Sequence, residues 1–227
     1  MSLIAKGGLV VSCQARVDNP LHGPVHMAAM ARAAEEAGAV ALRANGPADI
    51  AAIRACTSLP VIGINKIFAE APVYITPDRA AARAVIGAGA QILGLDCTER
   101  DRGTPDRWQD VLEEARAAGV ETFADVASLE EGRRAAEAGA TYVATTLSGY
   151  TEPGAPAPEG PDYDLIEALA SAVSVPVIAE GRIATPEQAV EAFRRGAHAV
   201  VVGTMITNPR AIAQGFVRAL ARQTTGV

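Results

Sequence analysis

An amine and a carboxylate that could move a proton follow two matching apolar segments of the chain. Lys66 lies six residues after Pro60, in Leu-Pro-Val-Ile-Gly, and Glu180 lies four residues after Pro176, in Val-Pro-Val-Ile-Ala. If both segments are β-strands, the two even offsets direct both side chains to the same face, because side chains alternate along a strand. Lys66 and Glu180 would then oppose each other across one cavity, where one removes a proton and the other stabilises charge or returns a proton. The alternative is a structural ion pair between them.

Two glycine turns after the last two apolar segments have the composition of a phosphate-binding site. Gly181 and Arg182 follow one segment, and Gly203 and Thr204 follow the other. Glycine lets a backbone N–H approach an anion closely, and barrel enzymes often bind phosphate with the loops after their last two strands. Arg182 would add positive charge. The alternative is a pair of ordinary strand-to-helix turns.

Short Val- and Ile-rich segments recur along the chain, with Ala-, Glu- and Arg-rich stretches between them. This alternation is typical of parallel strands joined by helices. We expect eight strands, near residues 9–14, 39–43, 61–65, 91–95, 120–124, 142–145, 175–179 and 199–202. Eight strand-helix units in 227 residues, about 28 residues each, predict a single (β/α)8 TIM barrel domain over residues 1–227.

In such a barrel the catalytic side chains come from the C-terminal ends of the strands, at the end of the barrel that we call the mouth. Nearly every predicted strand ends in a polar or charged residue, a pattern with little structural purpose in a packed core. These residues are Gln14, Arg43, Lys66, Asp96, Asp125, Thr145 with Thr146, Glu180 with Arg182, and Gly203 with Thr204. Asp96, Asp125 and Glu180 could meet around Mg²⁺, but hydrogen bonding to sugar hydroxyls is the simpler use, and we expect no metal.

Repeated signals mark where the helices between the strands begin and end. A glycine in the left-handed conformation stops a helix and turns the chain toward the next strand. Four glycines, each followed by an alanine and then by a predicted strand, match this signal: Gly38, Gly89, Gly139 and Gly196. A threonine N-cap followed by proline predicts a helix start at Thr76-Pro77 and another at Thr185-Pro186.

Two segments depart from this rhythm. Residues 151–163 hold four of the 14 prolines and three acidic residues, and they follow the sixth strand at the mouth. A loop of this length at that place is often a lid over the site, and a passive surface loop is the alternative. After the eighth strand we expect a C-terminal helix at about residues 207–222.

Composition excludes several classes of protein. Hydrophobic residues make up 49% of the chain, too many for a disordered protein, and a net charge of −6 with a pI near 5.2 argues against nucleic-acid binding. The three cysteines have no spacing typical of disulfides or zinc sites, and no dinucleotide or P-loop motif occurs. The longest uncharged apolar run, residues 196–206, is too short to span a membrane. No signal peptide is recognised, so we expect a cytoplasmic protein.

The chain resembles the N-acetylmannosamine-6-phosphate 2-epimerases along essentially its whole length. Thr-Thr-Leu-Ser-Gly-Tyr-Thr at 145–151 and Ala-Glu-Gly-Arg-Ile at 179–183 are specific to that family. The other resembling segments, in the same order, are Val-Ser-Cys-Gln-Ala (11–15), Leu-Arg-Ala-Asn-Gly (42–46), Val-Tyr-Ile-Thr-Pro (73–77), Ala-Asp-Val (124–126), Glu-Gly-Pro-Asp (159–162) and Val-Val-Gly (201–203).

The resemblance implies a cofactor-free isomerase that interconverts N-acetylmannosamine 6-phosphate and N-acetylglucosamine 6-phosphate in sialic-acid and amino-sugar catabolism. Matched position by position, Lys66 and Glu180 are the acid/base pair, and the sugar is held by Gln14, Arg43 and Asp125, to which we add Thr146. The phosphate is held by the turns at Gly181, Arg182, Gly203 and Thr204. Family members are often dimers packed through the last helix, so we expect a homodimer, with no nucleic-acid or membrane partner.

Several departures from the family pattern fall near the mouth. The pattern usually continues after the lysine with Arg-Asp, where this chain has Ile67 and Phe68, and Asn65 replaces an apolar residue. After the eighth strand the pattern usually has a basic residue following Ile-Thr, where this chain has Asn208, with Arg210 two positions on. These changes leave the reaction type intact, but they bear on the substrate's identity and on the strength of phosphate binding.

Epimerisation suits the predicted residues, and two other functions stay open. Removal of the C2 proton beside the C1 carbonyl of the open-chain sugar leaves an oxyanion, which Lys66, Arg43 or both could stabilise. The sequence does not decide whether Lys66 or Glu180 is the base. A phosphosugar lyase or decarboxylase would instead use Lys66 as a Schiff-base nucleophile. A non-catalytic barrel that binds sugar phosphates is the third reading.

Overall fold

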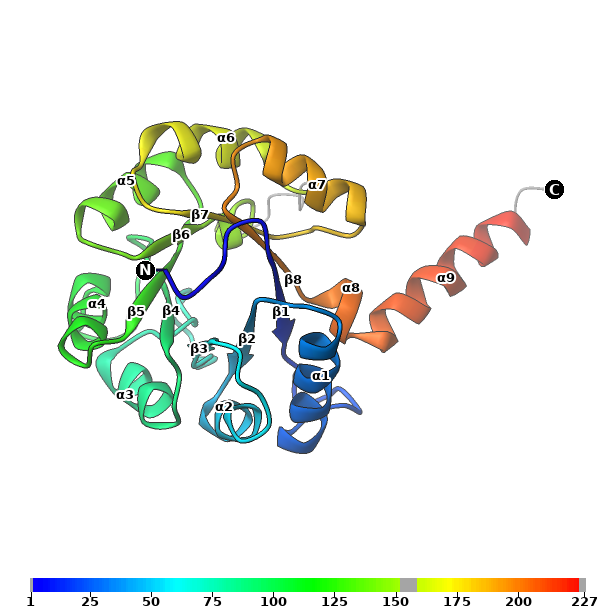
Figure 1. Cartoon of the computed structure of the whole chain (residues 1–227), viewed down its shortest axis with the longest axis horizontal. Helices are drawn as coiled ribbons and strands as arrows, with labels where there is room; N and C mark the ends of the chain where they lie inside the picture. Colours follow the sequence, from blue (N-terminus) through cyan, green and yellow to red (C-terminus); the bar gives the residue numbers. More distant parts are fainter. Residues whose placement is uncertain (1, 152–158, 225–227) are drawn as a thin grey trace.

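Eight parallel strands close into a barrel in the order in which they occur in the sequence (Figure 1). The computed structural model describes residues 2–151 and 159–224. The strands are β1 (Leu9–Cys13), β2 (Ala41–Asn45), β3 (Val61–Ile64), β4 (Ile92–Asp96), β5 (Glu121–Asp125), β6 (Tyr142–Ala144), β7 (Val177–Glu180) and β8 (Ala199–Val202). Pairing of β1 with β8 closes the sheet, with Val10 opposite Val201. The predicted (β/α)8 fold is confirmed, and each strand begins and ends within two residues of its expected bounds.

Helices form a ring around the outside of the sheet (Figure 1). They are α1 (Pro24–Glu36), α2 (Pro47–Arg54), α3 (Arg79–Gly87), α4 (Trp108–Ala117), α5 (Leu129–Glu137), α6 (Tyr163–Ala172) and α7 (Pro186–Arg194). Their buried faces pack on the outward side chains of the strands, for example Met27 of α1 and Leu112 of α4 in the same apolar cluster as Leu42 and Leu93. This layer fixes the direction of each strand.

The inward side chains of the strands fill the barrel in successive levels. The lower level is apolar and includes Ile4, Val10, Ala41, Ile62, Ile92, Phe123, Tyr142, Ile178, Ala199 and Val201. Arg43, Asp125 and Glu180 lie two residues beyond Ala41, Phe123 and Ile178 on the same strands. Because side chains alternate along a strand, these three charged residues also face inward, one level nearer the mouth.

Glycine ends the helices where the sequence predicted. The φ angles lie between 89° and 99° at Gly38, Gly89, Gly139 and Gly196. A β-carbon disfavours this left-handed conformation, so each of these positions needs glycine. The predicted start of α7 is also confirmed, because the Thr185 hydroxyl accepts a hydrogen bond from the Gln188 N–H and Pro186 occupies the first turn.

The other predicted helix start, at Thr76-Pro77, is wrong. Helix α3 begins at Arg79, and the side chain of Asp78 caps it by accepting from the Ala81 N–H. Thr76 has a φ of 46°, and its buried hydroxyl donates to the Gly94 carbonyl of β4 at 2.6 Å. A tertiary hydrogen bond therefore takes the hydroxyl that a local cap would have used.

The C-terminal helix expected at about residues 207–222 is present as the second of two helices that follow β8, and the short first helix was not predicted. The short helix α8 (Thr204–Thr207) ends at Asn208, where φ is −121° and ψ is 77°, and α9 (Pro209–Thr224) follows. The Asn208 side chain accepts a hydrogen bond from the Ala211 N–H at 3.1 Å, so it caps α9. Figure 1 shows α9 projecting away from the barrel.

The expected lid at residues 151–163 lies partly outside the described residues, which end at Thr151 and resume at Glu159. Tyr163, its last residue, begins α6. Over the described ranges, no helix combines the length and the apolar character that crossing a membrane requires.

Candidate active site

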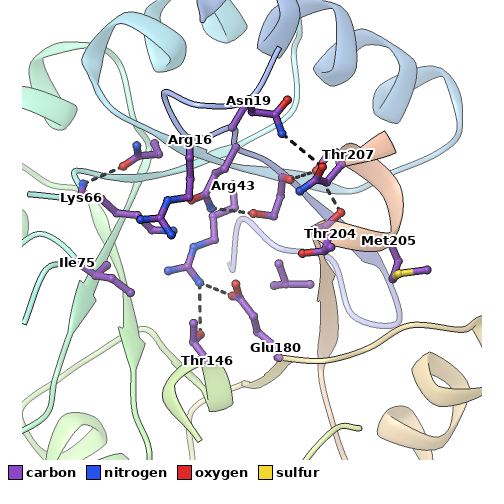
Figure 2. A pocket seen from close by; sticks show the side chains of 18 of the residues that line it. Arg16, Asn19, Arg43, Lys66, Ile75, Thr146, Glu180, Thr204, Met205 and Thr207 are labelled. Carbon is purple, nitrogen blue, oxygen red and sulfur yellow. Dashed lines mark hydrogen bonds and ion pairs between the residues drawn. The ribbon is translucent and has the colours of Figure 1, made fainter. Parts of the chain in front are cut away.

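A cavity of about 860 Å³ opens at the mouth of the barrel (Figure 2). Most of the residues singled out from the sequence line it: Gln14, Arg43, Lys66, Thr146, Glu180, Gly181, Arg182, Gly203 and Thr204. They belong to the ends of β1, β2, β3, β7 and β8, and to the 3-10 helix η1 (Thr145–Leu147) that follows β6. The strands thus bring together residues that lie up to 190 positions apart in the sequence, from Gln14 to Thr204.

Arg43 lies at the centre of the site, although only 1% of it is exposed. Its guanidinium donates to both carboxylate oxygens of Asp125, at 3.0 and 2.6 Å, and it also donates to Glu180 and to the Thr146 hydroxyl. Glycine at position 94, beside the guanidinium, makes room for Ile64, because a Cβ there would lie 2.5 Å from the Ile64 side chain. Arg43 therefore links the carboxylates of β5 and β7 into one charged cluster.

Burial and neighbouring charges shift the pKa values of Arg43 and Asp125 in this cluster. Burial opposes a charged guanidinium, but Asp125 and Glu180 outweigh burial and raise the pKa of Arg43 above its ordinary value. Burial raises the pKa of Asp125 to about 6, while the Arg43 guanidinium lowers it. Asp125 is fully buried beneath Arg43 and does not line the cavity, so its contact in this structure is with Arg43.

Glu180 is held at the mouth end of β7 with 14% of its side chain exposed. Its backbone N–H donates to the Thr145 hydroxyl at 3.1 Å, and this hydroxyl donates to the Glu180 carbonyl at 2.9 Å. The carboxylate forms its ion pair with Arg43. Glu180 is therefore paired with Arg43, and the alternative of a structural ion pair between Lys66 and Glu180 is not formed.

Lys66 lies just past β3, in a segment that is fixed by backbone contacts. It forms an isolated antiparallel bridge with Ile75, and its N–H donates to the Asn45 side chain at 2.8 Å. The neighbouring Asn65 donates to the Thr76 hydroxyl at 3.1 Å and accepts from the Thr76 N–H at 2.9 Å. Figure 2 shows Lys66 and Glu180 on different sides of the cavity, with Arg43 between them.

The Lys66 amine is poised to exchange protons near neutral pH. Burial and then the Arg43 charge lower its pKa from 10.5 to about 8, while Glu180 and Asp125 act in the opposite direction. A group whose pKa lies near the operating pH exchanges protons most efficiently in catalysis. The ammonium form prevails at neutral pH, and the neutral amine is about a tenth of the population.

Gln14 and Thr146 complete the inner walls. The Gln14 side-chain amide donates to the Ser12 hydroxyl at 2.8 Å, and Gln14 lines the cavity. The Thr146 hydroxyl accepts from Arg43 at 3.3 Å and is also hydrogen-bonded to the Asp125 carboxylate. Both side chains supply neutral hydrogen-bonding groups between the charged ones.

The turn after β7 binds its own arginine. Gly181 has a φ of 116° and Arg182 a φ of 57°. The Arg182 side chain donates to the carbonyls of Gly160 and Ser148, each at 2.6 Å. Arg182 thus contacts the residues on both sides of segment 152–158, and its guanidinium is already engaged by protein carbonyls.

The turn after β8 packs closely on β1. A Cβ at Gly203 would lie 3.2 Å from the Ser12 Cβ, and the Thr207 hydroxyl donates to the Ser12 carbonyl at 2.7 Å. Glycine therefore lets the α8 turn approach β1. Thr204 is exposed and lines the cavity beside it.

Sequence reasoning missed several residues that shape the site. Asn45 lies two residues after Arg43 on β2, so strand alternation could have placed it on the Lys66 side of the cavity. Arg102 donates to the carbonyls of Thr76 and Pro77, at 3.3 and 3.0 Å, and supports the Lys66 segment from a loop with no sequence signal. Arg16 also lines the cavity.

The alternative metal site does not form in the described residues. No three His, Cys, Asp or Glu side chains of residues 2–151 and 159–224 are grouped so that they could hold an ion. The Asp96 carboxylate accepts from the Thr98 hydroxyl at 2.7 Å and pairs with Arg100 at 2.6 Å. Asp96 therefore stabilises the loop after β4.

A (β/α)8 barrel with a lysine and a carboxylate around a polar cavity at its mouth defines an enzyme of the barrel class that acts on a small polar molecule. Known proteins agree with this class. The family described as "Putative N-acetylmannosamine-6-phosphate epimerase" (NanE) matches residues 27–222. The chain belongs to this family, as the resemblance of its motifs predicted.

Individual relatives cover nearly the full length of the chain. A "Putative N-acetylmannosamine-6-phosphate 2-epimerase" of Caldanaerobacter subterraneus is 49% identical over 96% of this chain and 93% of its own. A protein of the same name from Cutibacterium acnes is 49% identical over 94% of both chains. The solved structure of the N-acetylmannosamine-6-phosphate 2-epimerase from Clostridium perfringens has a TM-score of 0.91 and 40% identity, over 95% of this chain and 94% of that one.

Proposed function

We propose that this protein interconverts N-acetylmannosamine 6-phosphate and N-acetylglucosamine 6-phosphate by removing the proton at C2 and returning one to the opposite face. The observation that carries the proposal is the placement of Lys66 and Glu180 on different sides of one cavity, separated by Arg43. Family membership supports the choice of substrate. The reaction needs no oxidant or reductant, and the proposal includes no cofactor.

The reaction requires a base, an acid and a stabilised oxyanion. The C2 proton is acidic because C2 is bonded to the C1 carbonyl of the open-chain sugar. When this proton leaves, the electron pair moves to O1 and an enolate-like intermediate forms. Positive groups placed in advance around O1 lower its energy, and such stabilisation is usually the largest single contribution to catalysis. Arg43 and Lys66 are the cations of the inner cavity.

The charge states of the site suggest the roles of the pair. Arg43 binds Glu180 directly, and a Lys66 pKa of about 8 leaves mostly ammonium at neutral pH. In one direction the Glu180 carboxylate takes the C2 proton and the Lys66 ammonium donates a proton to the other face. In the reverse direction the proton starts on Glu180. The Lys66 amine then takes the C2 proton, and the Glu180 carboxylic acid donates its proton to the other face. Exchange with solvent resets the pair between turnovers.

The remaining candidate residues are proposed as the binding site for the sugar phosphate. Gln14, Thr146 and Arg43 would contact the acetamido group and hydroxyls, with Asp125 holding Arg43 in place. The phosphate would bind at the turns formed by Gly181, Arg182, Gly203 and Thr204. The close packing of Gly203 on Ser12 and the positive φ of Gly181 support backbone access at both turns.

The proposal is tested by incubating N-acetylmannosamine 6-phosphate with the protein in D₂O and recording proton NMR spectra. We expect the C2 proton signal to disappear and the N-acetylglucosamine 6-phosphate signals to appear, because each return of a proton brings in deuterium. The unphosphorylated sugar serves as a matched substrate control. Unchanged spectra with protein that is shown to be folded would contradict the proposed function.

A Schiff-base lyase or decarboxylase is the second candidate, because a desolvated lysine beside a cation is also what imine formation needs. The lowered Lys66 pKa is compatible with either role. Borohydride reduction in the presence of substrate separates them. A reduced adduct on Lys66 supports the lyase, and unlabelled Lys66 in an active enzyme supports the epimerase.

We further propose that two copies of the chain form a homodimer through α9. Three large apolar residues of this projecting helix are 65–69% exposed: Phe216, Val217 and Leu220. Contiguous apolar surface of this kind marks an interaction site. Light scattering should give twice the chain mass for the wild type and one chain mass for Phe216→Asp, with Gln214→Asp on the same helix as the control. A monomeric wild type would contradict the dimer.

A cytoplasmic location is the last part of the proposal. Cys13, Cys56 and Cys97 are free thiols in the structure, which suits a reducing compartment. Burial raises the pKa of the Cys13 thiol to about 12, so it is inert. Fractionation of cells that express the protein should recover it with cytoplasmic markers, and recovery with secreted proteins would contradict this.

A further inference from the structure

One guanidinium at the mouth has no hydrogen-bonding partner among the described residues. Arg16 is exposed and lines the cavity, and Figure 2 shows it extending from the loop after β1 toward the pocket centre. Across residues 2–151 and 159–224 it forms no ion pair, and its guanidinium lies over the Phe68 ring, 5.2 Å from the ring centre. Its N–H groups are therefore available to a ligand.

The other guanidiniums that line the cavity are already engaged. Arg43 binds Asp125 and Glu180, and Arg182 donates to two protein carbonyls. Arg210 pairs with Asp18 at 2.8 Å and also donates to the Asp18 carbonyl. Recruiting any of these three for a ligand would break existing contacts, whereas Arg16 has none to break apart from its stacking.

The aromatic contact orients Arg16. Phe68 stacks on Tyr74, with ring centres 5.3 Å apart and planes inclined by 22°. A guanidinium that lies over a ring uses its flat face, and its in-plane N–H donors stay free to form paired hydrogen bonds. Phosphate oxygens match such a fork of donors in charge and spacing. The rings of Phe68 and Tyr74 thus present Arg16 to an anion in the cavity.

Asn208 also lines the cavity, but it supplies no positive charge to a ligand. Its side chain is neutral and is used within the protein. Its oxygen accepts from the Ala211 N–H at 3.1 Å and from the Asn19 side chain at 3.3 Å. Asn208 therefore joins α9 to the loop after β1, the same loop that carries Arg16.

We propose that Arg16, stacked on Phe68, binds the phosphate of the sugar phosphate and sets the preference of this site for a phosphorylated sugar over a neutral one. This rests on the proposed function of the cavity. The phosphate is on C6, four carbons from the C2 atom that lies between Lys66 and Glu180. Arg16 lines the same cavity as the Gly181 and Gly203 turns.

The test compares wild type with Arg16→Met, Arg16→Lys and the control Arg32→Met, which removes an exposed arginine of α1 outside the cavity. For N-acetylmannosamine 6-phosphate we expect Arg16→Met to raise KM about 10- to 100-fold with kcat within about threefold, because charged hydrogen bonds to substrate are lost. The KM of Arg16→Lys should fall between those of wild type and Arg16→Met. The kcat/KM for unphosphorylated N-acetylmannosamine should change less than about threefold in every variant.

A binding measurement separates this proposal from the proposed reaction. Titration calorimetry with inorganic phosphate needs no turnover, and Arg16→Met should weaken phosphate binding about tenfold relative to wild type and Arg32→Met. Equal phosphate affinity in wild type and Arg16→Met overturns the role of Arg16, whatever sugar is turned over. A lower kcat with unchanged KM also overturns it, because Arg16 would then act on the Lys66 amine. Phosphate affinity that depends on Arg16 in a protein without epimerase activity overturns only the proposed reaction.

The aromatic support has its own readout. Phe68→Leu keeps an apolar residue but removes the ring, so Arg16 loses its orientation and keeps its charge. We expect a KM increase of about two- to fivefold for the phosphorylated sugar, the size of an exposed cation–π contact, and no change for the neutral sugar. An equal KM increase for both sugars would show that Phe68 contacts the sugar itself, which contradicts its role as the support of Arg16.

Discussion

The two ends of the barrel interior are built on opposite principles. At the lower end the inward residues are apolar, and the one polar group, the Tyr142 hydroxyl, is fully used: it contacts the Ile4 N–H, the Ser2 hydroxyl and the Glu121 carboxylate. At the mouth, one level up the same strands, Arg43, Asp125 and Glu180 form one ion-paired cluster, and Lys66, just past β3, lies within range of its charges. The same alternation of side chains therefore produces a self-contained core at one end and a charged cavity at the other.

This difference separates the residues that stabilise the protein from those that act on a substrate. Burying the apolar side chains of the lower end stabilises the fold. The mouth holds a lysine whose charged form is disfavoured and an Arg43 Nε that is buried without a hydrogen-bonding partner in the described part of the chain. Such costs are typical of functional sites. Substitutions at the two ends should consequently affect different measurements.

The largest effect is expected at the mouth, on turnover. Lys66→Met and Glu180→Gln should each lower kcat by about a thousandfold, because each removes one of the two proton-transfer groups. Circular dichroism and thermal melting should show folded protein in both cases. Near-wild-type kcat in either folded variant would remove that residue from the acid/base pair.

At the lower end the expected effect is on stability alone. Ile92→Ala should lower the free energy of unfolding by about 3 kcal/mol, since it leaves a cavity in a fully buried level. The kcat should stay within about threefold of wild type at a temperature where the variant is folded. Denaturant titration and steady-state kinetics on one preparation test both parts. A loss of kcat comparable to that of Lys66→Met would show that the two ends are not separate.

The pH dependence of turnover sharpens the assignment of the pair. The active site carries one shared proton in both directions, on Lys66 or on Glu180. Activity should therefore fall as this proton leaves, above the Lys66 pKa of about 8, by about tenfold per pH unit. The kcat/KM values for the two epimers, measured from pH 6 to 10, should show the same basic limb. A rise in kcat/KM through pH 8 would instead make neutral Lys66 the sole base.

The smallest expected effect is a gain in stability at the mouth. Folding lowers the Lys66 pKa from 10.5 to about 8, so between these values the unfolded chain binds more protons and wild-type stability rises with pH. A shift of this size corresponds to about 3 kcal/mol, and partial exposure of Lys66 to solvent reduces it. Lys66→Met should therefore stabilise the protein by about 2 kcal/mol below pH 8, and the gain should vanish as pH approaches 10.5. Urea titrations of both proteins at two pH values measure this. A destabilised variant at pH 7 would mean that Lys66 contributes to the core.

Local patterns predicted the features that depend on regular strand and helix geometry. The even offsets of Lys66 and Glu180 directed both to the cavity, and left-handed glycines such as Gly38 ended helices as expected. These features need only the alternation of a strand or the absence of a β-carbon. That all 227 residues form one cooperative domain stays a prediction.

Apart from Asn45, which strand alternation could have placed, the features that sequence reasoning missed depend on contacts between distant segments. Thr76 fails as a helix cap because β4 takes its hydroxyl. Asn208 divides the last helix where it also contacts Asn19, and Arg16 stacks on Phe68 from another loop. No local pattern encodes these pairings, because the barrel brings the loops together only after it closes.

The central claim is that Lys66 and Glu180 serve opposite faces of C2, and deuterium exchange in the two single variants tests it most directly. Each variant is incubated in D₂O with each epimer separately, and C2 deuteration is followed by NMR. Glu180 alone, in Lys66→Met, should exchange the C2 proton of one epimer without forming the other. Lys66 alone, in Glu180→Gln, should exchange the opposite epimer. Exchange of the same epimer in both variants, or interconversion by either one, would contradict the account.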